Sequence, residues 1–178
     1  NNLKAVTCPT IELKEYLSKI KFLEEKKLHF LPDAIIKINI FINNIKKKIN
    51  LPTNNKFILA VGRLTKQKNY LYMIDELEIF LKNNNYSLII LGEGEDRTII
   101  EKKIIEKKLT NKIFLCGYVK NPYPYMKKAS ALVLSSLWEE VGFVLVESAL
   151  SNLLLISSNC KNGPKEFLSQ GKAGYLFN

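Results

Sequence analysis

The sequence predicts an α/β domain built on a doubly wound parallel sheet. From residue 57 onward, short apolar runs alternate with longer amphipathic stretches. The runs are rich in leucine and β-branched residues and are bounded by Gly, Asn or Ser, which is typical of strands buried on both faces of a parallel sheet. The stretches between them are typical of crossover helices, so the order strand–helix–strand indicates this fold class.

Five strand–helix pairs can be followed in order, and a last strand begins after them. The predicted pairs are 57–61 with 70–83, 86–91 with 97–108, 113–116 with 122–129, 131–135 with 143–150 and 153–157 with 164–169, and the last strand begins at 175–177. The first helix has one apolar stripe, which predicts the face that packs on the sheet. The stripe consists of Tyr70, Met73, Ile74, Leu77, Phe80 and Leu81.

Ligands of such sheets bind beyond the carboxyl ends of the strands. The loops at that edge of the sheet therefore become the candidate positions for function. These loops are 62–69, 92–96, 117–121, 136–142 and 158–163.

The first 56 residues follow a different pattern. Residues 5–8 are typical of the end of a strand, and 28–31 of a second short strand. Thr10 is suited to cap a helix over 11–20.

Residues 34–50 are rich in Ile and Lys, and their isoleucines recur every three or four positions. This helical stripe consists of Ile35, Ile38, Ile42, Ile45 and Ile49. The helix either lies on an anionic membrane surface or is a connector that packs on the domain. We favour the connector because apolar stripes usually face a core.

Composition indicates a globular chain in a reducing compartment. Of 178 residues, 47% are hydrophobic and 25% charged, which favours a packed core over disorder. There is no apolar run long enough to span a membrane. The three cysteines, Cys8, Cys116 and Cys160, are far apart and odd in number. They predict no disulfide set, and we therefore expect a cytoplasmic location.

The formal net charge of +10 raises the alternatives of a nucleic acid or an anionic membrane as partner. Only Arg63 and Arg97 among the 27 basic residues are arginine, the side chain better suited to phosphates and base edges. The lysines also accompany abundant Asn and Ile, so we favour a solvated lysine surface and expect no nucleic acid.

The loop that follows the first strand of the sheet carries two cations. Gly62 ends the strand and permits a tight turn and close approach of a ligand. Arg63 and Lys68 follow, five residues apart, and they either converge on a diphosphate or are solvated surface charges. The sequence has neither a P-loop nor a Gly-x-Gly-x-x-Gly motif, so it indicates neither an ATPase nor a nicotinamide-binding protein.

The loop and helix at 135–150 carry two acids. Glu139 lies in the loop, and Glu147 lies about one turn into the helix. Gly142 stands where that helix begins, so the free backbone N–H groups of 142–144 favour an anion. The two carboxylates would accept hydrogen bonds from hydroxyl groups of a ligand. Alternatively, Glu139 is a helix cap and Glu147 a surface residue, although a buried carboxylate would need a partner.

In these motifs the chain resembles the family 4 glycosyltransferases of the GT-B fold. Arg63 and Lys68 match the family's G-R-x-x-x-x-K loop, and Glu139 and Glu147 match its E-x7-E motif. The segments 138–147 and 158–166 are similar to those of bacterial surface-polysaccharide transferases. The resemblance covers 57–178.

The resemblance implies a division of the chain. Residues 57–178 are the Rossmann-like nucleotide-sugar-binding domain of the C-terminal lobe, incomplete at its C-terminus. Residues 1–33 are a remnant of the N-terminal lobe, and 34–56 are the connector between the lobes.

The resemblance also implies a role for each motif residue. Arg63 and Lys68 hold the donor diphosphate, Glu139 binds hydroxyls of the transferred sugar, and Glu147 binds the ribose. Tyr118 and Val119 bracket the base. The amides of Gly142, Phe143 and Val144 meet the phosphate. The family's usual E-G-F-G-L wording is replaced here by Glu140-Val141-Gly142-Phe143, so the resemblance does not fix which amides those are.

The implied reaction is a retaining transfer of a hexosyl or N-acetylhexosaminyl group from a nucleoside diphosphate sugar, with UDP expected as the nucleotide. The acceptor is a lipid-linked glycan or surface polysaccharide, such as lipopolysaccharide or capsule, and the missing N-terminal lobe binds it. We therefore expect no transfer by this fragment alone. No Asp-x-Asp occurs, so we expect neither metal nor cofactor.

Three alternatives remain open at this point. A nucleotide-sugar 2-epimerase shares the two-lobed fold, a basic nucleic-acid-binding module would explain the charge, and a scaffold lobe would need neither acid. Peripheral association with the inner face of the membrane also stays open.

Overall fold

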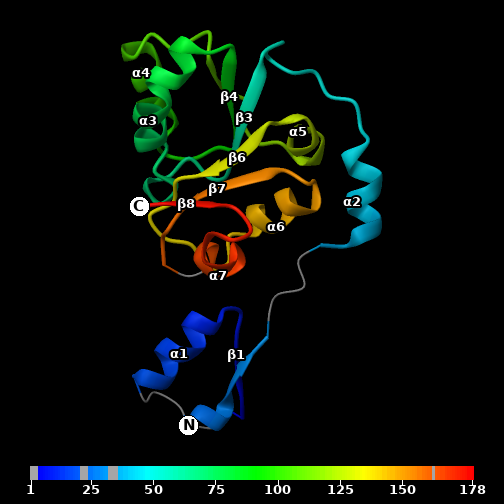
Figure 1. Ribbon diagram of the computed structural model, residues 1–178, viewed down its shortest axis with the longest axis vertical. Coiled ribbons are helices and arrows are strands. Elements are labelled where there is room, and N and C mark those ends of the chain that lie inside the picture. Colours follow the sequence, from blue (N-terminus) through cyan, green and yellow to red (C-terminus); the bar gives the residue numbers. More distant parts are fainter. Residues whose placement is uncertain (1–3, 21–23, 32–35, 162) are drawn as a thin grey trace.

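The structure is a computed structural model that describes residues 4–20, 24–31, 36–161 and 163–178. It contains a parallel sheet of six strands and a separate pair of strands near the N-terminus (Figure 1). The strands of the large sheet are β3 (Lys56–Val61), β4 (Tyr86–Leu91), β5 (Ile113–Leu115), β6 (Ala131–Leu134), β7 (Leu154–Ser158) and β8 (Tyr175–Phe177).

The large sheet has the order β5-β4-β3-β6-β7-β8, and every neighbouring pair is parallel. The chain winds outward from β3 through β4 to β5, and then returns to β6 on the other side of β3. The predicted doubly wound parallel sheet is therefore confirmed. The order reverses between β3 and β6, and in such sheets the crevice at that reversal is where ligands bind.

Helices cover both faces of the sheet (Figure 1). One face carries α3 (Tyr70–Asn83) and α4 (Arg97–Glu106), and the other carries α5 (Tyr123–Lys128) and α6 (Phe143–Leu150). The short α7 (Pro164–Phe167) precedes β8, and single 3-10 turns lie at Glu25–Lys27, Lys66–Lys68 and Ser169–Gly171. The crossover helices that parallel strands require are therefore present.

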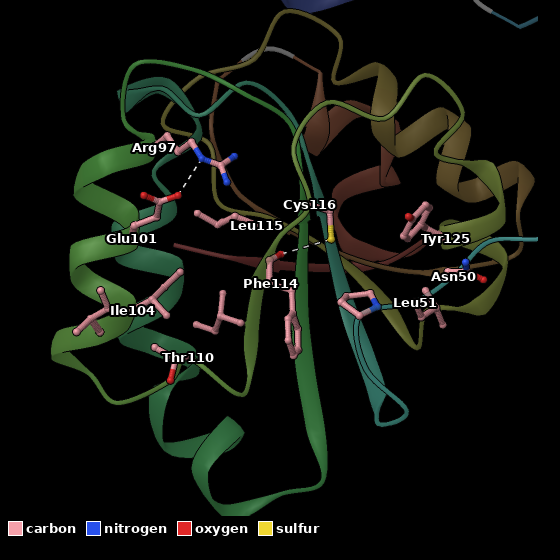
Figure 2. A pocket seen from close by; sticks show the side chains of 13 residues that line it. Asn50, Leu51, Arg97, Glu101, Ile104, Thr110, Phe114, Leu115, Cys116 and Tyr125 are labelled. Atoms are coloured by element: carbon pink, nitrogen blue, oxygen red, sulfur yellow. Dashed lines mark hydrogen bonds and ion pairs between the residues drawn. The ribbon is translucent and has the colours of Figure 1, made fainter.

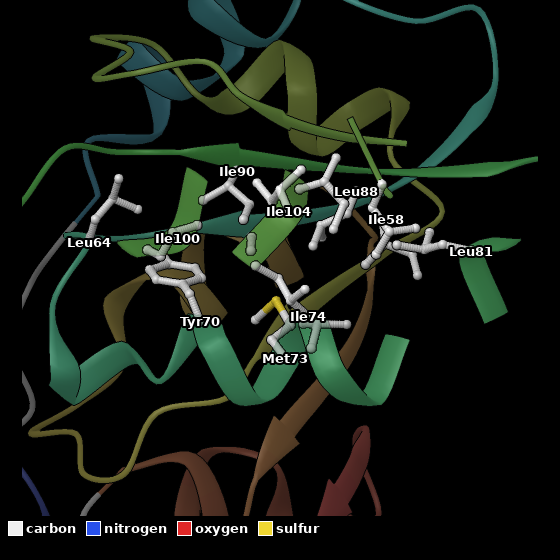
Figure 3. Packing of buried hydrophobic residues seen from close by; sticks show 14 residues of the cluster. Ile58, Leu64, Tyr70, Met73, Ile74, Leu81, Leu88, Ile90, Ile100 and Ile104 are labelled. Carbon is white, nitrogen blue, oxygen red and sulfur yellow. The ribbon is translucent and has the colours of Figure 1, made fainter. Parts of the chain in front are cut away.

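Alternate residues of each central strand point to opposite faces, so the sheet separates two cores. On the α3 side, Ile74 packs with Ile58 and Leu88 of the strands (Figure 3). On the other side, Leu59 and Leu132 pack with helix residues such as Leu145. The predicted stripe of α3 is buried at Tyr70, Met73, Ile74 and Leu81 and partly buried at Leu77.

Phe80 is the exception to the predicted stripe of α3. It is 38% exposed and its ring contacts Tyr86, with the ring centroids 5.3 Å apart. Phe80 lies in the last turn of α3, next to the start of β4, so it covers the end of the sheet instead of entering the core.

The N-terminal unit consists of β1 (Val6–Cys8), α1 (Ile11–Lys19) and β2 (Leu28–Phe30), with the two strands parallel. The side chain of Thr10 accepts a hydrogen bond from the backbone N–H of Leu13 at 3.1 Å, which confirms the predicted cap. In Figure 1 the unit lies on the α7 side of the large sheet. There the backbone N–H of Ile11 donates to the Glu166 carboxylate at 3.1 Å.

The connector forms a shorter helix than the sequence predicts, α2 (Ile38–Ile45). Phe41 is its buried residue and meets the ring of Tyr123 in α5 edge to face, with centroids 5.1 Å apart. Ile38 and Ile42 are 53% and 44% exposed, so the prediction that this stripe faces the domain is wrong for both. The helix touches the domain through one side only, and Phe41 occupies it.

Two further isoleucines of the predicted connector stripe, Ile45 and Ile49, are half-buried. The remaining one, Ile35, lies outside the described residues. Among the described residues, no helix combines the length and the apolar character needed to cross a membrane.

We expect the two isoleucines of α3 to differ sharply in their contribution to stability. Ile74 is fully buried, whereas Ile79 is 73% exposed. Ile74→Ala should lower the free energy of unfolding by about 2–5 kcal/mol because it leaves a cavity, and Ile79→Ala should change it by about 0.5 kcal/mol or less. Urea unfolding of both variants measures this, and equal losses would contradict the described packing.

Candidate functional site

A pocket of about 350 Å³ opens where the strand order reverses, beyond the carboxyl ends of β3 and β6. Three segments line it: the loop after β3, the loop after β6 and the first turn of α6. The lining residues are Val61, Gly62, Arg63, Gln67, Lys68, Glu139, Glu140, Val141, Gly142, Phe143 and Val144. The structure thus brings together the predicted site residues except Tyr118, Val119 and Glu147.

An ion pair between Lys68 and Glu139 closes one side of the pocket. The two side chains are 14% and 7% exposed, so each charge is largely withdrawn from water and is compensated by the other. The same carboxylate oxygen of Glu139 accepts a hydrogen bond from Ser136 Oγ at 2.5 Å. The N-cap of the following helix, α6 (Phe143–Leu150), is Gly142, and none of the described side chains caps it, so the alternative that Glu139 caps this helix is wrong.

Arg63 supplies a second positive charge to the pocket. No ion pair neutralises its guanidinium within the described ranges, unlike that of Arg97, which binds Glu93 and Glu101. The pocket therefore has an uncompensated cation beside a compensated one, which suits an anionic ligand.

Gly62 leaves space in the pocket, and its backbone angles do not call for glycine. A Cβ atom at this position would lie 3.1 Å from Cε of Lys68 and 3.2 Å from the hydroxyl of Tyr70. The Lys68 side chain therefore passes directly over Gly62. The Tyr70 hydroxyl donates to the Gly62 carbonyl at 3.2 Å, and burial together with the charge of Glu139 raises the pKa of Tyr70, so it stays protonated.

Hydrogen bonds join the loop after β3 to the loop after β6. Gln67 Nε2 donates to the carbonyl of Trp138 at 2.8 Å, and the backbone N–H of Leu137 donates to the carbonyl of Gln67 at 2.8 Å. Ser135 Oγ donates to the carbonyl of Lys68 at 2.7 Å. From the sequence alone no role is assigned to Gln67, Leu137 or Ser135, although Ser135 lies four residues before Glu139.

The start of α6 faces the same pocket. Gly142 is the N-cap and has a φ of +70°, a conformation that glycine adopts without steric cost. The first N–H groups of a helix have no acceptor within the helix, and Gly142, Phe143 and Val144 all line the pocket. Those amides and the positive end of the helix dipole add to the attraction for an anion.

The second acid, Glu147, lies deeper in α6 and outside the pocket lining. It is half-buried, and its carboxylate accepts a hydrogen bond from the Tyr123 hydroxyl at 3.2 Å. Burial raises the pKa of Glu147, while the bond from Tyr123 opposes that rise. The partner that a buried carboxylate needs is thus a neutral phenol from α5.

The remaining predicted residues lie in the loop after β5. Tyr118 is 77% exposed, and Val119 is half-buried against the core on the α5 side. Neither contacts the pocket, so the structure places them near the rim of the sheet without bringing them to the two cations.

A larger cavity lies elsewhere, along the edge strand β5 (Figure 2). Its volume is about 800 Å³, and it runs between α4 and the end of the connector at 50–52. Its lining is mainly apolar, with Phe114 and Leu115 at its centre. Its one guanidinium, that of Arg97, is already bound by Glu101 at 2.8 Å. Size alone therefore does not mark it as the functional site.

Comparison with known proteins identifies the family. The model of the family described as glycosyl transferases group 1 matches residues 41–178. The chain belongs to this family, and the resemblance inferred from its motifs is confirmed. The comparisons give no support to the epimerase or nucleic-acid alternatives.

Related proteins align with about two thirds of the chain or more. An uncharacterized glycosyltransferase of Methanocaldococcus jannaschii is 36% identical over 124 residues, which cover 69% of this chain and 30% of that protein. The N-acetylgalactosamine-N,N'-diacetylbacillosaminyl-diphospho-undecaprenol 4-alpha-N-acetylgalactosaminyltransferase of Campylobacter jejuni is 32% identical over 139 residues, covering 77% of this chain and 38% of that protein. The chain thus spans roughly a third of the length of these relatives.

The fold is also found in solved structures. The Anabaena protein HepE, solved in complex with UDP and glucose, superposes with a TM-score of 0.84 at 18% identity, covering 98% of this chain and 49% of that one. At this identity the match establishes the fold, a Rossmann-like lobe of the kind in GT-B glycosyltransferases.

The raised pKa of Glu147 predicts a pH-dependent effect of Glu147→Gln. Below the ordinary value of 4.5 the carboxyl is protonated in both the folded and the unfolded chain. Above it, the folded state holds the proton longer, so the wild type loses stability as the pH rises through the raised pKa. The variant lacks this loss and should gain stability relative to the wild type from about pH 4 to neutral pH.

Urea unfolding of the wild type and of Glu147→Gln, at about pH 4 and at neutral pH, measures this gain in stability. Glu140→Gln, a change at an exposed acid in the same motif, is the matched control. A difference between wild type and Glu147→Gln that is the same at both pH values would contradict the role of burial.

Proposed function

We propose that the chain is the donor-binding part of a retaining glycosyltransferase. It binds a nucleoside diphosphate sugar, with UDP as the nucleotide, and presents the sugar to an acceptor hydroxyl. The observation that carries this proposal is the pocket in which Arg63, Lys68, Glu139 and the start of α6 meet. Two cations and a helix N-terminus suit a diphosphate, and an adjacent carboxylate suits sugar hydroxyls.

The pocket offers stabilisation where the reaction develops charge. The bond between the anomeric carbon and the terminal phosphate oxygen breaks, the acceptor oxygen forms the new bond to that carbon, and the departing diphosphate takes up the proton of the acceptor hydroxyl. Negative charge grows on the departing diphosphate, and Arg63, Lys68 and the amides at 142–144 are placed to receive it. Fixed donors aimed at such a charge are among the largest contributions to catalysis.

The ribose and the base occupy the part of the site beyond α6. Glu147 accepts hydrogen bonds from the ribose hydroxyls, and the bond to Tyr123 holds its carboxylate in place until the ribose arrives. Tyr118 and Val119 border the base from the loop after β5. The raised pKa of Glu147 implies that this part of the site works best above that pKa, where the carboxylate is ionised.

The acceptor belongs to a surface glycan. The Campylobacter jejuni relative is named for transfer to a diphospho-undecaprenol-linked sugar, and a Staphylococcus aureus relative, 30% identical over 143 residues, is a poly(ribitol-phosphate) alpha-N-acetylglucosaminyltransferase. By analogy, the whole protein acts on a lipid-linked or polymeric acceptor at the cytoplasmic face of the membrane. A second lobe would bind that acceptor opposite the pocket.

We expect Arg63→Ala to weaken the binding of UDP by roughly 10–100-fold, because a hydrogen bond to a charged group contributes about 1.5–3 kcal/mol. Lys66→Ala is the matched control, since Lys66 lies in the same loop but outside the pocket lining. The fluorescence of Trp138, the single tryptophan of the chain and 50% exposed, serves to follow the titration. Equal affinities of the two variants would refute the role of Arg63.

We expect UDP to bind without a metal. Within the described ranges no three metal-ligating side chains cluster, and two cations already face the site of the diphosphate. Addition of EDTA should therefore leave the affinity for UDP unchanged, measured by the same fluorescence titration. An affinity that falls with EDTA and returns with Mg²⁺ would show that the charge is compensated differently.

A further inference from the structure

The carboxylate of Glu139 has two partners, and both contact the same oxygen. Lys68 Nζ and Ser136 Oγ each bind Oε1 of Glu139. The structure gives Oε2 no hydrogen-bond partner among the described residues. This second oxygen belongs to a residue that lines the pocket, so it is the oxygen available to a hydroxyl group of a ligand.

We propose that Ser136 is a positioning residue, which holds Glu139 in its sugar-binding orientation while Lys68 engages the diphosphate. This inference rests on the function proposed above. When a diphosphate draws Lys68 toward itself, the ion pair with Glu139 weakens. The hydroxyl of Ser136 then remains as the hydrogen bond that fixes the carboxylate and directs Oε2 toward the sugar.

Ser136 is itself held firmly. Ser136 is 2% exposed. Its backbone carbonyl accepts a hydrogen bond from Ser158 Oγ at 2.6 Å. Ser158 is the last residue of β7, which pairs with β6. The backbone of Ser136 is therefore held by the neighbouring strand of the sheet, and its position does not depend on Lys68 or Glu139.

The adjacent serine supports the other half of the pocket. Ser135 Oγ donates to the carbonyl of Lys68 at 2.7 Å and to that of Asn69 at 3.2 Å. These bonds fix the loop that carries Lys68 and leave Glu139 untouched. Two consecutive hydroxyls thus serve different parts of the donor: Ser135 the diphosphate, Ser136 the sugar.

The experiment compares two affinities in each variant. Titration calorimetry of the 178-residue chain measures the Kd for UDP and for UDP-glucose, UDP-galactose, UDP-N-acetylglucosamine and UDP-N-acetylgalactosamine. The readout is the ratio of the Kd for the best-bound UDP-sugar to the Kd for UDP, which isolates the contribution of the sugar. Loss of stability alone changes both affinities together and leaves the ratio constant.

Ser136→Ala should raise this ratio about tenfold to a hundredfold, the loss expected for one hydrogen bond to a charged group, with the Kd for UDP within about twofold of wild type. Ser136→Cys retains most of the volume but is a weak donor, so it should raise the ratio as well and guards against a folding defect. In a Glu139→Gln background, Ser136→Ala should change the ratio no further.

Ser87→Ala is the matched control. Ser87 is fully buried and its hydroxyl contacts Thr53 Oγ1 at 3.3 Å and Asn55 Nδ2 at 3.2 Å, but it lies at the start of β4, away from the pocket. In Ser87→Ala, the ratio of the Kd for the UDP-sugar to the Kd for UDP should equal that of the wild type. An unchanged ratio in both Ser136 variants would overturn the positioning role and leave the donor site standing, whereas a wild-type chain that binds neither UDP nor any UDP-sugar would overturn the proposed function itself.

Discussion

The ion pair between Lys68 and Glu139 determines how the pocket meets a ligand. Its two charges come from positions 71 residues apart in sequence, on loops that adjoin only because β3 and β6 are neighbours. Each charge is largely buried, and removing one partner would leave the other uncompensated, which is costly. A ligand that replaces both partners at once therefore binds most favourably. A diphosphate sugar meets this condition, because its phosphates compensate the lysine while its hydroxyls satisfy the carboxylate.

The same requirement contributes to specificity. A phosphate without a sugar draws Lys68 away and leaves the charge of Glu139 with only the Ser136 hydroxyl. A free sugar offers nothing that compensates Lys68. Discrimination of this kind comes from unpaired buried groups in the wrong complex as much as from contacts in the right one. Arg63, which has no carboxylate partner in the described part of the chain, attracts phosphate without imposing this condition.

Much of the fold could be predicted because buried parallel strands have a distinctive composition, and α3 and α6 have the predicted bounds. The interactions between segments could not. An isoleucine repeat marks a helical face but not its neighbour, and α2 meets α5 through Phe41 instead. The motifs and the shared edge of the sheet predicted that Arg63, Lys68 and Glu139 meet around one ligand, but not that Lys68 and Glu139 form an ion pair with each other. The partnership of Tyr123 with Glu147 was hidden for the same reason, since it joins two different helices.

The two acids of the motif show how position within one helix–loop unit produces two kinds of carboxylate. Glu139 precedes α6 and forms an ion pair with Lys68. Glu147 lies within α6, where burial opposes ionisation and only a neutral phenol is at hand. Because Tyr123 also packs on Phe41, the environment of Glu147 depends on how the connector helix sits against α5.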